Sequence, residues 1–253
     1  MGVNSAGSLE RNPLLDVVHD EGDLLVVNKP AGLVCHPTKG DEFSSLISRA
    51  RLYCNRREMG SPQLINRLDR ETSGIVLIAT SEARAAEMRL RWERGEVAKT
   101  YLAIVEGDLA FQERRIDLPI GQDEASPVAI KGCVRVDGAA SVTEIRRIAQ
   151  FARADRTYTV IHAFPLTGRK HQIRIHLAHV GHPLVGDKLY GHDERCYLDF
   201  VMGRLTLEQR ARLSLENHAL HSEAVEWNSG GLQRKCTAPV RDEMRVFMGS
   251  CCV

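Results

Sequence analysis

Short apolar runs separated by polar turns dominate the first eighty residues. Residues 14–18 and 24–27 are apolar, and the acidic, glycine-containing residues 20–23 between them predict a hairpin turn. Pro30 is expected to end the second strand, because proline cannot donate to a strand ladder. Residues 74–79 form an unbroken apolar run, which is typical of a buried strand.

Helical patterns appear between these strands. Residues 43–54 are expected to be helical. Ser81 has the character of an N-cap, so a helix is predicted from there to about Arg94, with Gly95 closing it.

A third helix is predicted further along the chain. Ile173, Leu177 and Val180 are spaced as one apolar helical stripe, and Gly181 and Pro183 are expected to stop the helix.

The remaining pattern completes an α+β domain. Thr206 and Gln209 have the spacing of a capping box, which predicts a helix to about Glu216. Because no repeat or linker interrupts the pattern, we expect a flexible leader over residues 1–12 and one domain over 13–253. Further strands are predicted at residues 101–105, 115–118, 133–136, 142–148, 157–163 and 219–227.

Charge is distributed unevenly although the total is close to zero. The 253 residues have a formal net charge of +1. Residues 145–190 alone carry +6, since their only acids are Asp155 and Asp187, and residues 45–75 carry +3. Both windows are rich in arginine, which suits forked recognition of phosphate. The distribution therefore favours a polyanionic partner, with solvated basic faces as the plain alternative.

Several classes of protein are excluded or disfavoured. The seven cysteines are scattered without a CxxC pair, which indicates free thiols in a reducing cytoplasm. No apolar run approaches the roughly 18 residues of a membrane span, and the N-terminus has no signal-peptide core. His176 and His179 share a helical face, but HExxH is absent, so no metal is expected. Walker and GxGxxG motifs are also absent, so we expect no cofactor.

One polar segment precedes the buried strand at 74–79. Asp69 lies there between Arg67 and Arg70, and neighbouring cations favour its ionised form by lowering its pKa. An ionised carboxylate is the state that a nucleophile needs. The plain alternative is an aspartate that anchors a turn.

A second polar segment opens the later helix. Arg169, Lys170, Gln172 and Arg174 lie at or near its N-terminus, where backbone N–H groups and the helix dipole attract anions such as phosphate. Tyr101, within an apolar strand, is by itself more typical of a core residue than of a catalytic one.

Together these segments resemble the RluA family of RNA pseudouridine synthases. The resemblance runs in order from about residue 14 to 240. It rests on N-K-P-A-G-L-V at 28–34, N-R-L-D-R-E-T-S-G at 66–74, K-T-Y at 99–101, T-G-R-K-H-Q-I-R-I-H at 167–176, G-H-P at 181–183, G-D-K-L-Y-G at 186–191, His221 and A-P at 238–239.

The resemblance implies both a fold and a reaction. The fold is a mixed, mostly antiparallel central sheet with flanking helices and an RNA-binding cleft. The reaction is the isomerisation of uridine in structured RNA, tRNA or rRNA, to pseudouridine after base flipping, with no cofactor. The expected partner is RNA, with no membrane and no metal, and we expect a cytoplasmic monomer.

The family's motifs also imply roles for single residues. Asp69 corresponds to the catalytic aspartate, Arg169 to the arginine that pairs with it, and Tyr101 to the proposed base. Arg67 corresponds to the residue that holds the flipped nucleotide or fills its place. The remaining expected RNA contacts are Asn66, Lys170, Gln172 and Arg174.

Two departures from the family pattern stand out. Asn66 occupies a position where the family usually has histidine, and no N-terminal RNA-binding domain is expected before the match. Residues 192–217 are interpreted as a variable helical insertion. A non-catalytic RNA-binding protein on the same fold is the main alternative. A carboxylate glycosidase is another, although it usually needs two acids near one bond, and only Glu71 lies near Asp69 in the sequence.

Overall fold

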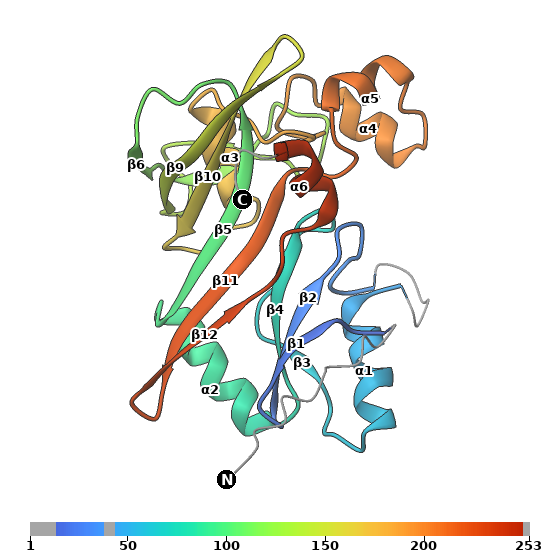
Figure 1. Cartoon of the computed structure of the whole chain (residues 1–253), viewed down its shortest axis with the longest axis vertical. Coiled ribbons are helices and arrows are strands. Elements are labelled where there is room, and N and C mark those ends of the chain that lie inside the picture. Colours follow the sequence, from blue (N-terminus) through green and yellow to red (C-terminus); the bar gives the residue numbers. More distant parts are fainter. Residues whose placement is uncertain (1–13, 38–43, 250–253) are drawn as a thin grey trace.

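A computed structural model describes residues 14–37 and 44–249 of the chain (Figure 1). The predicted leader over residues 1–12 lies outside the described residues. None of the helices in the described ranges is long and apolar enough to span a membrane.

One mixed sheet forms the centre of the fold, in the order β1-β2-β4-β11-β5-β10-β9-β6. Neighbouring strands are antiparallel except β4 and β11, which run parallel. The sheet therefore confirms the predicted mostly antiparallel α+β fold. Its strands are β1 (Val17–Asp20), β2 (Leu24–Lys29), β4 (Ser73–Ala79), β5 (Val97–Glu106), β6 (Glu113–Asp117), β9 (Val142–Arg153), β10 (Arg156–Pro165) and β11 (Leu220–Ser229).

Four shorter strands complete the β structure. β3 (Gln63–Leu64) pairs with β4, and β12 (Leu232–Thr237) pairs with β11. β7 (Ile120–Gln122) and β8 (Gly132–Val134) form a separate two-stranded hairpin. The sequence pattern did not predict β3, β7 or β12, because two or three residues, or a mostly exposed edge, leave no apolar run to recognise.

Helices cover the sheet because its strands alternate their side chains. Ala103 and Ile161 point into a cluster with α1 (Leu46–Arg56) and α3 (Gln172–His179). Ile104 and Val160, one position along, point to the other side, into a cluster with α6 (Asp242–Met248). A third cluster surrounds α2 (Glu82–Glu93), which has Ser81 as its N-cap as predicted.

The predicted insertion folds as two short helices at one end of the molecule (Figure 1). They are α4 (Arg195–Val201) and α5 (Leu207–Leu213). Thr206 and Gln209 form the expected capping box, but α5 ends at Leu213, where Ser214 takes a left-handed conformation, rather than at Glu216.

The parallel contact between β4 and β11 depends on a glycine. Gly74 has φ +106°, and a Cβ there would lie 2.2 Å from the carbonyl oxygen of Ser222. Only glycine allows the two backbones to approach this closely while adopting that conformation. The contact holds the residues that precede β4 in a fixed position beside β11.

We expect Gly74→Ala to lower the free energy of unfolding by about 3 kcal/mol or more, because it adds a steric clash to the cost of a positive φ. Gly203→Ala is the control, since Gly203 also has a positive φ but no atom within 4 Å of its Cβ position. It is expected to cost only about 1 kcal/mol. Urea denaturation measures both, and equal losses would contradict the close approach.

Candidate active site

An open pocket of about 810 Å³ lies beside the residues that precede β4. Its lining includes the segment around Asp69, β5 with Tyr101, the start of α3 with Arg174, and the end of α2 with Trp92. Segments more than a hundred residues apart in the sequence therefore meet here. The polar segments that the sequence analysis singled out share one pocket.

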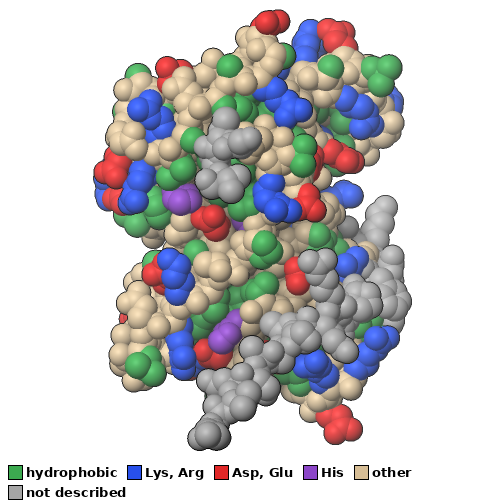
Figure 2. All heavy atoms as spheres, viewed as in Figure 1, with side chains coloured by type: hydrophobic (Ala, Val, Ile, Leu, Met, Phe, Trp, Pro, Cys, Tyr) green, Lys and Arg blue, Asp and Glu red, His purple; other side chains and the backbone are tan. Residues whose placement is uncertain are grey.

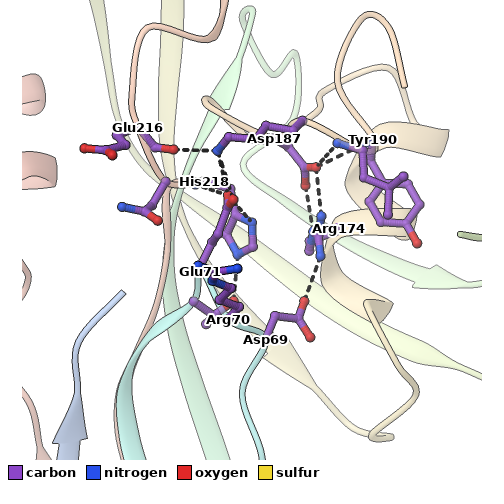
Figure 3. Close-up of polar contacts among 12 residues, drawn as sticks. Asp69, Arg70, Glu71, Arg174, Asp187, Tyr190, Glu216 and His218 are labelled. Carbon is purple, nitrogen blue, oxygen red and sulfur yellow. Dashed lines mark hydrogen bonds and ion pairs between the residues drawn. The ribbon is translucent and has the colours of Figure 1, made fainter. Parts of the chain in front are cut away.

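A buried chain of charges organises the pocket (Figure 3). Asp187 is fully buried and receives a forked pair of hydrogen bonds from Arg174, from Nε at 2.7 Å and Nη2 at 2.9 Å. Two backbone N–H groups, of Leu189 and Tyr190, donate to the same carboxylate. The third guanidinium nitrogen of Arg174 then donates to Asp69 at 2.9 Å.

This arrangement sets the charge state of Asp69. Burial by itself would raise its pKa, but the Arg174 guanidinium outweighs that effect and holds the pKa below its usual value. The same guanidinium also keeps the pKa of Asp187 depressed against the effect of full burial. The Asp69 side chain is 28% exposed, so an ionised carboxylate is open to the pocket.

The structure corrects the arginine that pairs with Asp69. The prediction that Arg169 forms this pair is wrong, because Arg169 lies in the loop before α3 and donates to the carbonyl of Ala140 instead. Arg174 lies on the first turns of α3 and points inward between the two aspartates. Its predicted role as an RNA contact is replaced by this buried one.

His171 lies at the N-terminal end of α3 and is a further neighbour of Asp69. Its Nδ1 lies 2.8 Å from the Tyr190 hydroxyl, and its Nε2 lies 3.7 Å from Asp69. Burial lowers the pKa of His171 to about 4, so the ring is neutral at neutral pH. Tyr190 also accepts a hydrogen bond from the N–H of Gly132, which connects α3 to β8.

A second set of contacts holds the loop on which Asp69 sits. Lys29 is completely buried and donates to three backbone oxygens, including that of Arg70. Lys188 forms a buried ion pair with Glu71 at 2.9 Å. Phe200 of α4 lies against both Arg70 and Lys188 through its ring, so the insertion also packs on this loop.

Two histidines contact the side chains of the residues that follow Glu71. The side chain of Thr72 is 2.7 Å from His218, and that of Ser73 is 2.9 Å from His221. Arg241 donates to the backbone oxygen of Glu71. The loop is therefore fixed on both sides of Asp69, which suits a group that has to meet a substrate at one defined position.

Tyr101 lies near Asp69 and lines the same pocket. Burial raises its pKa to about 12, and a hydrogen bond with the Ser222 side chain opposes this only in part. Tyr101 is therefore a protonated donor at neutral pH.

The four residues expected to touch RNA in addition to Arg174 fall into two groups. Asn66 and Gln172 are buried, and their amides are occupied by the protein itself. Gln172 alone bonds Thr167, the N–H of Arg169, Val142 and Thr143. Both expectations are corrected: these amides build the loops around the pocket.

Arg67 and Lys170, by contrast, are exposed and line the pocket. With Arg70, Lys99, Arg169 and Arg174 they give the lining six Lys or Arg side chains against the single carboxylate of Asp69. The face of the molecule in Figure 2 instead mixes both signs of charge. The pocket is therefore a local concentration of positive charge.

The basic window at residues 145–190 contributes less to this pocket than its sequence suggests. Arg146 pairs with Glu113, and Arg147 lies 3.8 Å from Asp108, on the sheet edge. Arg174 and Lys188 are neutralised by buried acids. Three acids outside the window, Glu113, Asp108 and Glu71, thus offset up to half of the +6.

Asp187 is the important residue that the sequence reasoning did not assign. A signal was available, because Asp187 is one of only two acids in a strongly basic window. Such an acid within an otherwise basic segment is expected to have an arginine partner when it is buried. Lys29, His171 and the Glu71–Lys188 pair carried no comparable signal.

The sequence and fold can be compared with those of known proteins. The family model for RNA pseudouridylate synthase matches residues 23–179. The chain belongs to the RNA pseudouridylate synthase family. This confirms the resemblance to the RluA family, and a relative in Yersinia pestis is named "Dual-specificity RNA pseudouridine synthase RluA". It is 34% identical over 179 residues, covering 70% of this chain and 82% of the relative.

Other pseudouridylate synthases extend the comparison. The Bacillus subtilis protein named "Uncharacterized RNA pseudouridine synthase YhcT" is 34% identical over 178 residues, which cover 70% of this chain. The chain spans only 58% of the length of that relative. A solved structure, human RNA pseudouridylate synthase domain containing 1, matches with a TM-score of 0.69 and 25% identity, covering 89% of this chain and 83% of that one.

The described part of this family member contains no group of three or more His, Cys, Asp or Glu side chains placed to hold a metal ion. The pocket lining also contains no second carboxylate beside Asp69, because Glu71 is held by Lys188. The pair of acids that a carboxylate glycosidase needs is therefore not present in this pocket.

We expect Arg174→Gln to lower the free energy of unfolding by about 3–5 kcal/mol, because it leaves Asp187 buried without its cation. Arg169→Gln is the matched control and should change stability by less than about 0.5 kcal/mol, as usual for an exposed side chain. Urea denaturation at neutral pH measures both. Similar losses in the two variants would contradict the pairing.

The neutral state of His171 predicts a pH dependence. Its folded pKa of about 4 lies below the ordinary 6.5, so between these values the unfolded chain binds more protons and stability falls with falling pH. Asparagine tolerates the positive φ of position 171. We therefore expect His171→Asn to reduce the loss of unfolding free energy on acidification by about 2–3 kcal/mol. Urea denaturation at about pH 7 and pH 4.5 measures the loss in both proteins. The same difference between the two pH values in the variant and the unaltered protein would refute the prediction.

Proposed function

We propose that this protein isomerises uridine in RNA to pseudouridine. The observation that carries the proposal is Asp69, kept ionised by Arg174, as the single carboxylate of a pocket whose lining also holds six Lys or Arg side chains. The pocket offers a positively charged surface to a phosphate backbone and a single reactive carboxylate within it. Membership of the pseudouridylate synthase family supports the same reaction.

Asp69 is the proposed catalytic residue. In the reaction the bond between the ribose C1′ and N1 of the base breaks, the base turns, and a bond from C1′ to C5 forms. The C5 proton leaves and N1 gains a proton, so the product is an isomer and no co-reactant is needed. A carboxylate fixed beside the glycosidic bond can assist its cleavage.

Tyr101 is the proposed group for the proton transfer at C5. It lies near Asp69, and it is protonated in the free protein. We infer that it takes up the proton from C5 while its own proton passes on to N1 of the turned base, which has to gain one in the reaction. This role fits a phenol fixed in the pocket by Ser222.

Arg67, Arg169 and Lys170 are the proposed RNA contacts. Arg67 and Lys170 are exposed at the pocket, and Arg169 lines it while its Nε donates to Ala140. A uridine in a folded RNA must leave its stack to reach Asp69, at a cost of a few kcal/mol. The planar guanidinium of Arg67 is suited to stacking on bases around the vacated position.

We further propose a structured RNA, tRNA or rRNA, as the substrate and a cytoplasmic monomer as the acting form. Residues 13–253 are proposed to act as one domain with the insertion at 192–217. The cysteines at 35, 54, 133, 196 and 236 are free thiols, in keeping with a reducing compartment.

We expect Asp69→Asn to reduce tritium release from [5-³H]uridine-labelled RNA at least about a thousandfold, because an amide has no ionised oxygen to act on the glycosidic bond. Asp108→Asn is the control, an exposed aspartate at the sheet edge that should keep full activity. RNA binding is measured alongside.

Full turnover by the Asp69→Asn protein would remove Asp69 from the proposed role. RNA binding without any tritium release by the unaltered protein, across total cellular RNA, would instead favour a non-catalytic RNA-binding protein.

A further inference from the structure

Lys99 is a cation of the pocket with no acidic partner. It lies on β5 and lines the pocket, and its ammonium is 5.3 Å from the centre of the Trp92 ring of α2. No carboxylate of the described residues acts on it, and burial alone lowers its pKa. Lys99 is therefore partly removed from water without a counter-charge.

The cations around it are arranged differently. On α2, Arg84 pairs with Glu21 and Glu87, and Arg91 pairs with Glu87. Glu96, the acid nearest to Lys99 in sequence, is engaged by Arg91 and Arg94, neither of which lines the pocket. Within the described residues, Lys99 is compensated by the aromatic face of Trp92, which attracts a cation but leaves the ammonium donors free for another group.

The position of Lys99 relates it to the proposed reaction. Lys99 and Tyr101 are two residues apart on the same strand, so their side chains leave β5 on the same side, about 7 Å apart. Tyr101 in turn borders Asp69. An RNA strand with one nucleotide against Asp69 and Tyr101 would bring a neighbouring phosphate within reach of Lys99.

We propose that Lys99, held over Trp92, binds a backbone phosphate of the nucleotide next to the one that enters the pocket. The inference rests on the proposed function in taking RNA as the substrate. It adds a phosphate position on β5, separate from the exposed cations Arg67 and Lys170, and it assigns Trp92 the task of holding the lysine side chain in place.

A phosphate contact has a defined signature in binding. Each neutralised phosphate releases counterions, so the slope of log affinity against log salt concentration falls by about 0.7–0.9 when one contact is lost. The loss is also the same for every base sequence, because the backbone carries no sequence information. If Lys99 had only a structural role, replacing it would leave the slope of log affinity against log salt concentration unchanged.

The experiment uses Lys99→Gln in the full chain carrying Asp69→Asn, so that binding is measured without turnover. The probes are two fluorescently labelled stem–loop RNAs, with and without uridine in the loop, titrated across a range of salt concentrations. We expect Lys99→Gln to weaken both about three- to tenfold and to lower the slope by about one unit. Lys99→Arg should restore most of the affinity.

Lys235→Gln is the matched control, because Lys235 is an exposed lysine paired with Glu226 on another strand. It should leave the slope unchanged. An unchanged slope in the Lys99→Gln protein, or a loss confined to one of the two RNAs, would overturn the proposal. A failed tritium assay would refute the proposed isomerase activity while this binding test kept its meaning.

Discussion

The forked ion pair between Asp187 and Arg174 is the interaction on which the rest of the pocket depends. A buried arginine is costly unless its donors are used, and Asp187 with its two backbone N–H contacts supplies a partner that cannot move. Arg174 is thereby aimed at Asp69 rather than at solvent. The charge of Asp69 is thus fixed by an acid more than a hundred residues away in sequence.

The same principle explains how a nearly neutral protein can have a cationic pocket. Most of its arginines and lysines meet acids, either inside, as Lys188 meets Glu71, or on the sheet edge, as Arg146 meets Glu113. Among the described residues, the five cations of the pocket lining other than Arg174 form no ion pair, and Lys99 is the clearest example. Local pairing, and not the net charge of a sequence window, decides where an anion is attracted.

Much of the fold was predictable from periodicity, and the site only in part. The apolar run at 74–79 and the capping residues Ser81 and Thr206 gave elements that the structure confirms. Asp69 was found because its segment matched a family motif. The partner arginine was misplaced by five positions, since spacing along the chain does not show whether a side chain turns outward from a loop, as at Arg169, or inward from a helix.

The claim that Arg174 keeps Asp69 ionised can be tested directly on the folded protein. The measurement is a ¹³C NMR titration of the Asp69 carboxyl carbon, assigned with the Asp69→Asn protein, from pH 7 down to about pH 4. The predicted result is an Asp69 signal that is still mainly that of the carboxylate at pH 4, because its pKa lies below the ordinary value near 3.9. A protonation step of Asp69 above about pH 4 would contradict the account.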